Sequence, residues 1–423
     1  MAPSTATSPE ARWNDSWRWV VLALLFASTT LNYVDRAILG VLLPVIRADI
    51  PIDGKTYGWI TAAFQGAYTI GAVGCGWLLD RYGTKLGMAA MVGVWSVAAA
   101  LHGIVTAPFQ FGVWRAALGL AEAGNFPAAA KAAGEWFGPR ERAFAIGIFN
   151  AGTTAASVLG PPALIAFQKV IGWQACFGLV GALGVGWLVA WWRWFPATAV
   201  APRRAEDGRA GSLRAVLARR EAWGYGIAKF FTDPAWWFLL FWLPLYFKDV
   251  RQFPIERVGW SLSAVYLMAG LGAVAGGWVS GRLIAAGWPR GRARKTTMLG
   301  CVLLMPAAAL GVTVESPLVG VLLLGVAAMA HQAWATNLFT TATDVFPAEA
   351  VGRVSGFGGT LGGGAGVIFS ALVPGYLIGS VGYRPLFIGM VGFYVIAWLA
   401  VHRLMGSLEL IVGVDYADGK GAA

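Results

Sequence analysis

The sequence predicts an all-α membrane protein with twelve transmembrane helices in two pseudo-symmetric six-helix bundles. The composition indicates this class, because 57% of the 423 residues are hydrophobic and only 13% are charged. The apolar residues form twelve runs, six on each side of a polar break. The two sides also share an internal repeat, which is typical of membrane proteins built from duplicated bundles.

The apolar runs are long enough to cross a bilayer as helices, since about 20 helical residues span its roughly 30 Å hydrocarbon core. We expect the spans near residues 17–46, 57–79, 86–106, 109–136, 143–168, 171–195, 222–247, 258–286, 297–314, 317–345, 354–379 and 382–403. The predicted domains are an N-terminal bundle (1–196), a cytoplasmic linker (197–221), a C-terminal bundle (222–405) and a cytoplasmic tail (406–423).

Basic residues are concentrated in alternate loops, and this asymmetry predicts the orientation in the membrane. Loops rich in Lys and Arg resist translocation and stay in the cytoplasm. The basic loops contain Arg81, Lys85, Arg140, Arg142, the linker arginines, Arg290, Arg292, Arg294, Lys295 and Arg353. We therefore expect a multi-pass protein of the inner (plasma) membrane with both termini in the cytoplasm. Because this topology explains the net charge of +11, we expect no nucleic-acid partner.

The internal repeat relates the second predicted span to the eighth. Residues 58–81 align with residues 259–282 at an offset of 201. The identical positions in the first copy are Gly58, Trp59, Ala63, Gly71, Ala72, Val73, Gly76, Trp77 and Arg81. Duplicated bundles of this kind hold their substrate between them near the middle of the membrane and rock about it.

An adjacent Asp35 and Arg36 lie inside the first apolar run. An ionisable residue at the centre of a span costs roughly 2.5–3.5 kcal/mol, so it usually faces a protein-lined or water-filled interior. Arg115 and Glu122 are seven residues apart on the fourth span and share one face. Since neighbours on a helix diverge by about 100°, we expect Asp35 and Arg36 to have different partners.

These four charges allow two interpretations. One is a purely structural charge network between the first and fourth spans. The other is functional: an arginine binds a substrate carboxylate with its planar fork, while an acid exchanges a proton as access alternates. In the functional interpretation Asp35, Glu122 and Arg115 form the proton-coupling group.

The turn after the second span contains glycines, an acid and bases at fixed spacing, namely Gly76, Asp80, Arg81, Gly83 and Lys85. This spacing resembles the loop signature of the major facilitator superfamily, which implies the major facilitator fold. The turn would then latch one conformation through an acid–base pair. The alternative is an ordinary polar turn that obeys the positive-inside rule.

Longer motifs extend the resemblance over the membrane region. They are Glu135 to Arg142, Phe149 to Gly152, Lys229 to Phe238 and His331 to Phe339. Together they resemble the anion:cation symporter family, in particular its hexuronate (galacturonate and glucuronate) transporter branch. The resemblance implies that Arg36 is the carboxylate ligand and that Asp35 and Glu122 are proton sites. It also implies substrate contacts at Tyr68, Gln332, Trp334 and Asn337, with Tyr33 and Asn150 as further candidates.

Several of these residues have a plainer interpretation. Trp334 is equally a packing residue, and His331 is more readily a core histidine than a proton relay. Lys229 and Asp233 are four residues apart and could simply pair with each other. Gly270 stands where the resemblance leads us to expect an acid, which leaves the substrate open. The scattered Cys75, Cys176 and Cys301 predict inert core thiols and no metal site.

We predict a secondary transporter that imports a hexuronate by proton symport with alternating access. Another organic anion, such as an aldonate, an aldarate or an aromatic carboxylate, is the alternative substrate. A non-transporting membrane sensor of such an acid and an intramembrane enzyme are weaker hypotheses, because the chain shows no long output domain and no nucleophile or metal-ligand pattern. We expect a monomer without cofactor or metal. The sequence does not decide between proton and sodium coupling.

Overall fold

A computed structural model gives the fold of residues 15–195 and 213–410, which are helical apart from short turns. The linker arginines Arg203, Arg204 and Arg209 lie outside the described residues, as do residues 1–14 and most of the predicted tail.

The N-terminal half consists of five helices that make six crossings. They are α1 (Asp15–Asp49), α2 (Gly54–Leu101), α3 (Pro108–Glu122), α4 (Asn125–Trp136) and α5 (Pro139–Trp194). Two of them hold two crossings each, because Gly83 breaks α2 and Gly172 breaks α5. Both glycines have a positive φ, 76° and 81°, which side chains other than glycine rarely adopt. The helices α3 and α4 together form one crossing.

The predicted fourth span is interrupted directly after Glu122, between α3 and α4. Pro127 lies in the first turn of α4 and has no N–H to continue the hydrogen-bond ladder of α3. Gly124 at the break lies so close to Met91 that a Cβ there would be 1.8 Å from its sulfur. The break therefore leaves Glu122 at the end of α3.

The C-terminal half also makes six crossings. Its helices are α6 (Leu213–Leu217), α7 (Arg220–Leu245), α8 (Ile255–Ala285), α9 (Arg290–Leu304), α10 (Pro306–Gly311), α11 (Pro317–Val345), α12 (Ala348–Gly366), α13 (Val373–Val381) and α14 (Arg384–Leu404). Single π-helical turns extend α7 over Tyr246–Val250 and join α12 to α13 over Val367–Leu372. The short α6 and the first two residues of α7 occupy the end of the segment predicted as linker.

The twelve predicted spans are confirmed as six crossings in each half of the described chain. Length and apolar composition alone identify seven helices that could span a membrane. One of these, Phe144–Trp194, contains two crossings, on either side of Gly172. The remaining crossings are less apolar or are divided into shorter helices, as α3 with α4 and α9 with α10 are.

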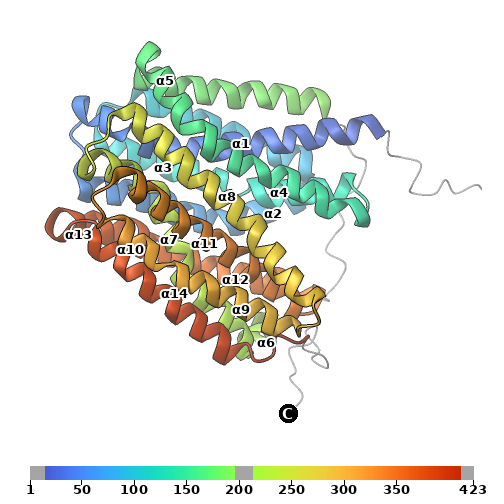
Figure 1. Cartoon of the computed structure of the whole chain (residues 1–423). Coiled ribbons are helices and arrows are strands. Elements are labelled where there is room, and N and C mark those ends of the chain that lie inside the picture. Colours follow the sequence, from blue (N-terminus) through green and yellow to red (C-terminus); the bar gives the residue numbers. More distant parts are fainter. Residues whose placement is uncertain (1–14, 196–212, 411–423) are drawn as a thin grey trace, which may run out of the picture.

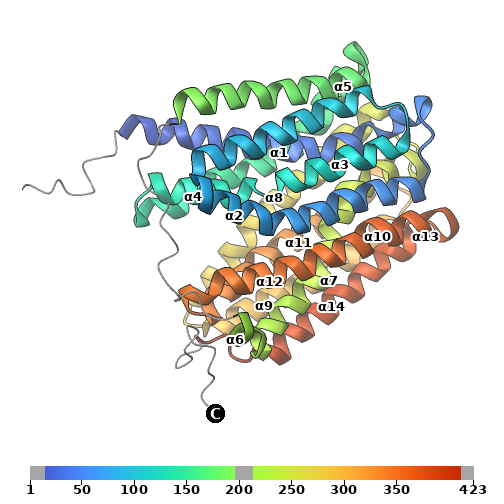
Figure 2. The same cartoon turned by 180° about the vertical axis from the view of Figure 1, so that it is seen from behind.

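The two halves lie side by side, and their helices run between two ends of the molecule (Figure 1). At one end, here called the linker end, α1 begins, α4 ends and α6 lies (Figure 2). The opposite end, here called the loop end, has the turn between α1 and α2, the break at Gly172 and the turn between α13 and α14. The halves meet where α2 packs on α12 and α13, α5 on α8, and α1 on α7.

Polar and close backbone contacts join the halves at the loop end. Arg47 Nη1 lies 2.9 Å from Asp249 Oδ2, and Lys169 pairs with Glu256. The backbone of α2 at Gly58 touches the π-helical turn before α13 and α13 itself, because a Cβ there would lie 2.8 Å from the carbonyl oxygen of Ala371 and 3.0 Å from the Cα of Gly375. The halves are therefore in contact at the loop end, although a cleft of about 530 Å³ remains between them beside Arg47 and Asp249.

The halves separate toward the linker end. Thr69 of α2 meets Gly363 of α12 near the middle, and a Cβ on Gly363 would lie 2.4 Å from the Thr69 hydroxyl oxygen. Two helical turns nearer the linker end, on the same face of α2, a Cβ on Gly76 would meet nothing within 4 Å. The same holds for Gly359 and Gly356 on the matching face of α12. The space between the halves is therefore open at the linker end.

Candidate functional site

A buried ion pair between Arg36 and Glu122 lies in the middle of the N-terminal half. Arg36 is on α1 and Glu122 ends α3, and the side chains are 2% and 0% exposed. The Nε atom of Arg36 donates to Oε2 of Glu122 at 2.8 Å. The low exposure makes this contact energetically important, because removing one partner leaves an uncompensated buried charge.

The side chain of Arg36 pairs with Glu122, whereas Asp35 meets Arg115 through its backbone carbonyl and its carboxyl Oδ1 has no protein partner. That Asp35 has a side-chain partner of its own therefore stays a prediction. Arg115 Nη1 donates to the backbone carbonyl of Asp35 at 3.1 Å, and the Asp35 side chain is buried beside it. The four predicted charges are thus gathered at the contact of α1 with α3. In this conformation Arg115 hydrogen-bonds the backbone of α1, while Glu122 forms an ion pair with the side chain of Arg36.

The charge cluster has more hydrogen-bonding capacity than the protein uses. Buried atoms without a protein partner include Asp35 Oδ1, Arg36 Nη2, Glu122 Oε1, and Nε and Nη2 of Arg115. Buried polar groups are normally hydrogen-bonded, so such a concentration of free donors and acceptors calls for an explanation. A polar anion placed here would find an unused guanidinium N–H on Arg36.

Three aromatic rings surround the Arg36 guanidinium. Its central carbon lies 4.6 Å from the ring centre of Tyr68, 4.9 Å from that of Tyr33 and 5.5 Å from that of Trp237. Tyr33 and Tyr68 belong to the N-terminal half, whereas Trp237 projects from α7 of the other half. Arg36 is therefore a buried cation that contacts side chains of both halves.

The loop-end side of Arg36 is sealed. The pocket on that side is too narrow to admit a water molecule, and the residues that line it with Arg36 are Leu39, Tyr57, Thr61, Phe64, Arg115 and Phe241. Tyr33, Tyr68 and Trp237 each lie about one helical turn nearer the linker end and are only half-buried. A ligand therefore reaches Arg36 from the linker end.

The sequence analysis missed the amide side chains that support this cluster. Asn32 donates to the Glu122 backbone carbonyl at 3.4 Å, and Asn125 donates to the Thr29 hydroxyl at 3.2 Å. Gln65 is buried beside Gly366 of α12, and its Oε1 lacks a protein partner. Asn32 is four residues before Arg36, so its position on the same helical face could have identified it.

The predicted substrate contacts on α11 are divided between the core and the half-buried surface. Trp334 is fully buried and donates from its indole to the Thr232 hydroxyl at 3.2 Å. Asn337 is also fully buried and donates to Gly276 of α8 at 3.0 Å. In this conformation both hold the C-terminal half together, whereas Gln332 is half-buried.

Asn150 on α5 is half-buried and donates to the carbonyl of Ile146 one turn earlier, at 3.0 Å. It lies four residues before Thr154, the residue that approaches Gly270 of α8. A Cβ on Gly270 would lie 2.7 Å from the Thr154 methyl group. The expected acid at Gly270 would therefore collide with the other half unless Thr154 moved.

Lys229 and Asp233 form the salt bridge that their spacing predicts, at 2.8 Å between Nζ and Oδ2. His331 is a core histidine: it hydrogen-bonds the Tyr394 hydroxyl and stacks on Trp236 at 5.5 Å between ring centres. Cys75, Cys176 and Cys301 are buried free thiols.

The predicted latch makes its contacts within the N-terminal half. Asp80 Oδ1 lies 3.0 Å from Nζ of Lys131 on α4. Arg81 lies over Trp77 and Tyr82 of its own helix, and Lys85 lies over Trp192. Gly83 makes the sharp break, and Gly76 faces open space.

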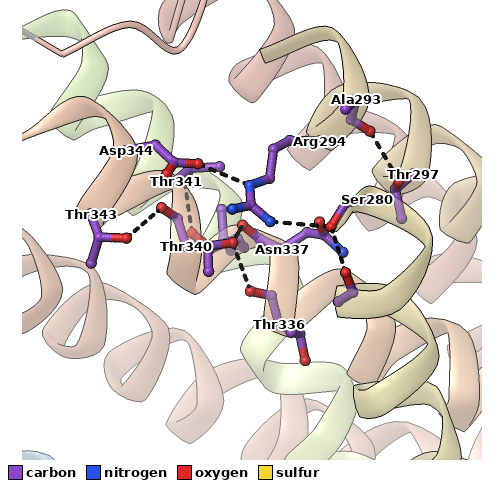
Figure 3. A network of polar contacts seen from close by, with 12 residues as sticks. Ser280, Ala293, Arg294, Thr297, Thr336, Asn337, Thr340, Thr341, Thr343 and Asp344 are labelled. Carbon is purple, nitrogen blue, oxygen red and sulfur yellow. Dashed lines mark hydrogen bonds and ion pairs between the residues drawn. The ribbon is translucent and has the colours of Figure 1, made fainter. Parts of the chain in front are cut away.

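A polar network also joins α8, α9 and α11 within the C-terminal half, at its linker end (Figure 3). Arg294 of α9 donates to Asp344 of α11 at 2.9 Å and to the Ser280 hydroxyl at 3.1 Å. In the N-terminal half, Thr84 donates to Glu135 of α4 at 2.5 Å. Each half thus ties its third crossing to its fourth at the linker end.

Residues 25–366 match the Major Facilitator Superfamily. The chain therefore belongs to this superfamily, and it is a multi-pass membrane transporter, not an enzyme. The resemblance seen in the loop signature is confirmed at the level of the superfamily.

Two curated relatives and one solved structure are similar over nearly the whole chain. The hexuronate transporter of Escherichia coli strain K12 is 29% identical over 418 residues, covering 93% of each chain. The D-galactonate transporter of Escherichia coli O6:H1 is 26% identical over 436 residues, covering 97% of this chain and 99% of that one. A bacterial homologue of the human lysosomal transporter Spinster, in an inward-facing and unoccupied conformation, aligns with a TM-score of 0.76. It is 20% identical and covers 93% of this chain and 98% of its own, so it supports the fold alone.

Proposed function

We propose that the protein imports a sugar acid, a hexuronate such as galacturonate or glucuronate, by proton symport. The observation that carries this proposal is the unused Nη2 of Arg36, buried beside two acids at the contact of the two halves. The similarity to a hexuronate transporter points to the same class of substrate.

Arg36 would bind the substrate carboxylate, because a planar guanidinium forms two parallel hydrogen bonds with a carboxylate. In the absence of substrate, Glu122 occupies one of its donors. A substrate carboxylate that displaces Glu122 removes the cation beside this buried acid, which favours its protonated form. Anion binding and proton uptake are thereby coupled, with Asp35 as the second proton site.

Tyr68, Tyr33, Gln332 and Asn150 are the half-buried candidates for contacts with the substrate hydroxyls. Trp334 and Asn337 would contribute by fixing the position of α11, unless the helix rotates during transport. Coupling to protons rather than sodium, and a monomeric state, belong to the same proposal.

Alternating access would arise when the two halves rock about this site. With both termini in the cytoplasm, the open linker end faces the cytoplasm and the closed loop end faces outward. The turn at Asp80 and Arg81 would latch the opposite conformation, in which the linker ends of the halves approach each other.

The similarity to a D-galactonate transporter favours an aldonate as the second candidate substrate. Uptake of labelled acids into vesicles, with and without a proton gradient, tests the proposal. We expect accumulation of galacturonate or glucuronate that depends on the gradient. Binding without accumulation would contradict transport, and accumulation that requires sodium would contradict proton coupling.

A further inference from the structure

We propose that Trp237 is the residue by which the C-terminal half selects cyclic sugar acids over open-chain ones. Its indole face would stack on the C–H face of a pyranose whose carboxylate is bound by Arg36. This inference rests on the proposed function and adds to it the form of the substrate, a six-membered ring.

Trp237 contributes a wall of the site from the half opposite to Arg36. Its ring centre lies 5.5 Å from the Arg36 guanidinium carbon and 5.8 Å from the ring centre of Tyr68. A ligand bound between Arg36 and the C-terminal half therefore meets this indole.

The exposed fractions of the aromatic side chains along α7 indicate that Trp237 lies toward the open linker end. Phe241, one turn nearer the loop end, is 3% exposed and lines the sealed pocket. Trp237 is half-buried, as are Tyr33 and Tyr68. A substrate that enters from the linker end meets this half-buried surface first.

The preceding tryptophan has a different role. Trp236 stacks on His331 with an interplanar angle of 6° and packs against Tyr266 at 5.8 Å, both within the C-terminal half. Consecutive residues on a helix point about 100° apart, so the two indoles face different surroundings. The Trp236 indole also hydrogen-bonds the Tyr33 hydroxyl of the N-terminal half, so Trp236 borders the site as well.

Trp398 of α14 is the control, because it is half-buried like Trp237 but donates to the Lys295 carbonyl at 3.2 Å and stacks on His402, both within the C-terminal half.

The chemistry of the candidate substrates explains why an indole would discriminate between them. A hexuronate has an aldehyde that closes a pyranose ring, and one face of this ring presents C–H groups. An aldonate or aldarate lacks the aldehyde, so its free anion is an open chain with hydroxyls distributed around it. Stacking of a well-placed apolar face on an aromatic ring corresponds to a preference of about two- to tenfold.

The test is competition for labelled galacturonate uptake by purified full-length protein in proteoliposomes. The competitors are glucuronate as a ring acid, and galactonate and galactarate as open-chain acids. We expect the wild-type protein to bind glucuronate more tightly, and Trp237→Ala to reduce this preference by about two- to tenfold. Trp237→Phe should keep part of the preference, and the control Trp398→Phe should keep all of it.

The ratio of two inhibition constants is measured within one variant, so partial loss of folded protein cancels. If Trp237→Ala does not transport, competition for binding measured by thermal stabilisation gives the same ratio. A wild-type preference for open-chain acids, or an unchanged ratio in Trp237→Ala, would overturn the role of Trp237 while leaving sugar-acid transport intact. If the wild-type protein binds neither kind of acid, the proposed function fails as well.

Discussion

The guanidinium of Arg36 donates to Glu122 across the contact of α1 and α3, at 2.8 Å between Nε and Oε2, and its Nη2 has no protein partner. One side chain thus combines a neutralised charge with an unused donor. The ion pair with Glu122 stabilises the buried charge of Arg36 when no substrate is bound. The free Nη2 leaves a hydrogen-bond donor that could bind a substrate.

Arg36→Lys is expected to weaken substrate binding roughly ten- to hundredfold, because an ammonium cannot form the two parallel bonds of a guanidinium. The folded protein should remain, since the cation beside Glu122 is retained. Thermal stabilisation by galacturonate measures the binding, and the unfolding temperature without ligand measures the fold. Equal losses of both would favour a purely structural role.

Asp35→Asn should bind substrate but lose uptake driven by a proton gradient. The amide preserves the size of the side chain and cannot exchange a proton. Counterflow of labelled substrate without a gradient serves as the control, because it requires binding and rocking but no net proton movement. A variant that still accumulates substrate against its gradient would exclude Asp35 as a proton site.

Glu122→Leu should lower the free energy of unfolding by about 3–5 kcal/mol, since it leaves the buried Arg36 charge unpaired. Arg36→Met should cost less, because Glu122 can take up a proton and become neutral. The double variant should lose much less than the sum, because no unpaired charge remains. Reversible unfolding in detergent measures all three variants. Additive losses would show that the two side chains are not coupled.

Asp249→Asn removes the ion pair with Arg47 that joins the halves at the loop end. Exposed ion pairs contribute about 0–1 kcal/mol, so the population with an open loop end should rise up to about fivefold. Labelling of a cysteine introduced at Ile378, beside this pair, measures the opening. Glu141→Gln is the control, because its pair with Arg18 is similarly exposed but lies within one half. Equal labelling of the two variants would contradict a gating role.

Gly58→Ala should prevent full closure of the loop end. Its Cβ would lie 2.8 Å from the Ala371 carbonyl oxygen and 3.0 Å from the Gly375 Cα, both backbone atoms of the other half. Gly93→Ala is the control, because its Cβ would meet Leu188 of the same half at an ordinary 3.7 Å. Distances between spin labels across the loop end should lengthen in the first variant only, and unchanged distances there would refute the steric argument.

The twelve crossings could be predicted from the sequence, because a helix that crosses the lipid needs a long run of apolar side chains and such runs are visible in the sequence. The sequence also predicted that Lys229 pairs with Asp233, because this follows from the geometry of a single helix. The interruption after Glu122 was missed, although Pro127 marks it, since the apolar run continues across it.

Apart from the charge cluster of the first and fourth spans, the contacts between helices could not be predicted from the sequence. Trp236 and Trp237 are chemically identical neighbours, yet Trp236 stacks on His331 and hydrogen-bonds Tyr33, whereas the ring of Trp237 lies beside the Arg36 guanidinium. Trp334 was predicted as a substrate contact but is fully buried, whereas Trp237 was not singled out from the sequence. The sequence by itself determined the helices, their number and which charges lie inside the membrane, because these depend on local hydropathy and helical period. Only the tertiary structure decided which side chains face the space between the halves, because that depends on how whole helices rotate and pack against one another.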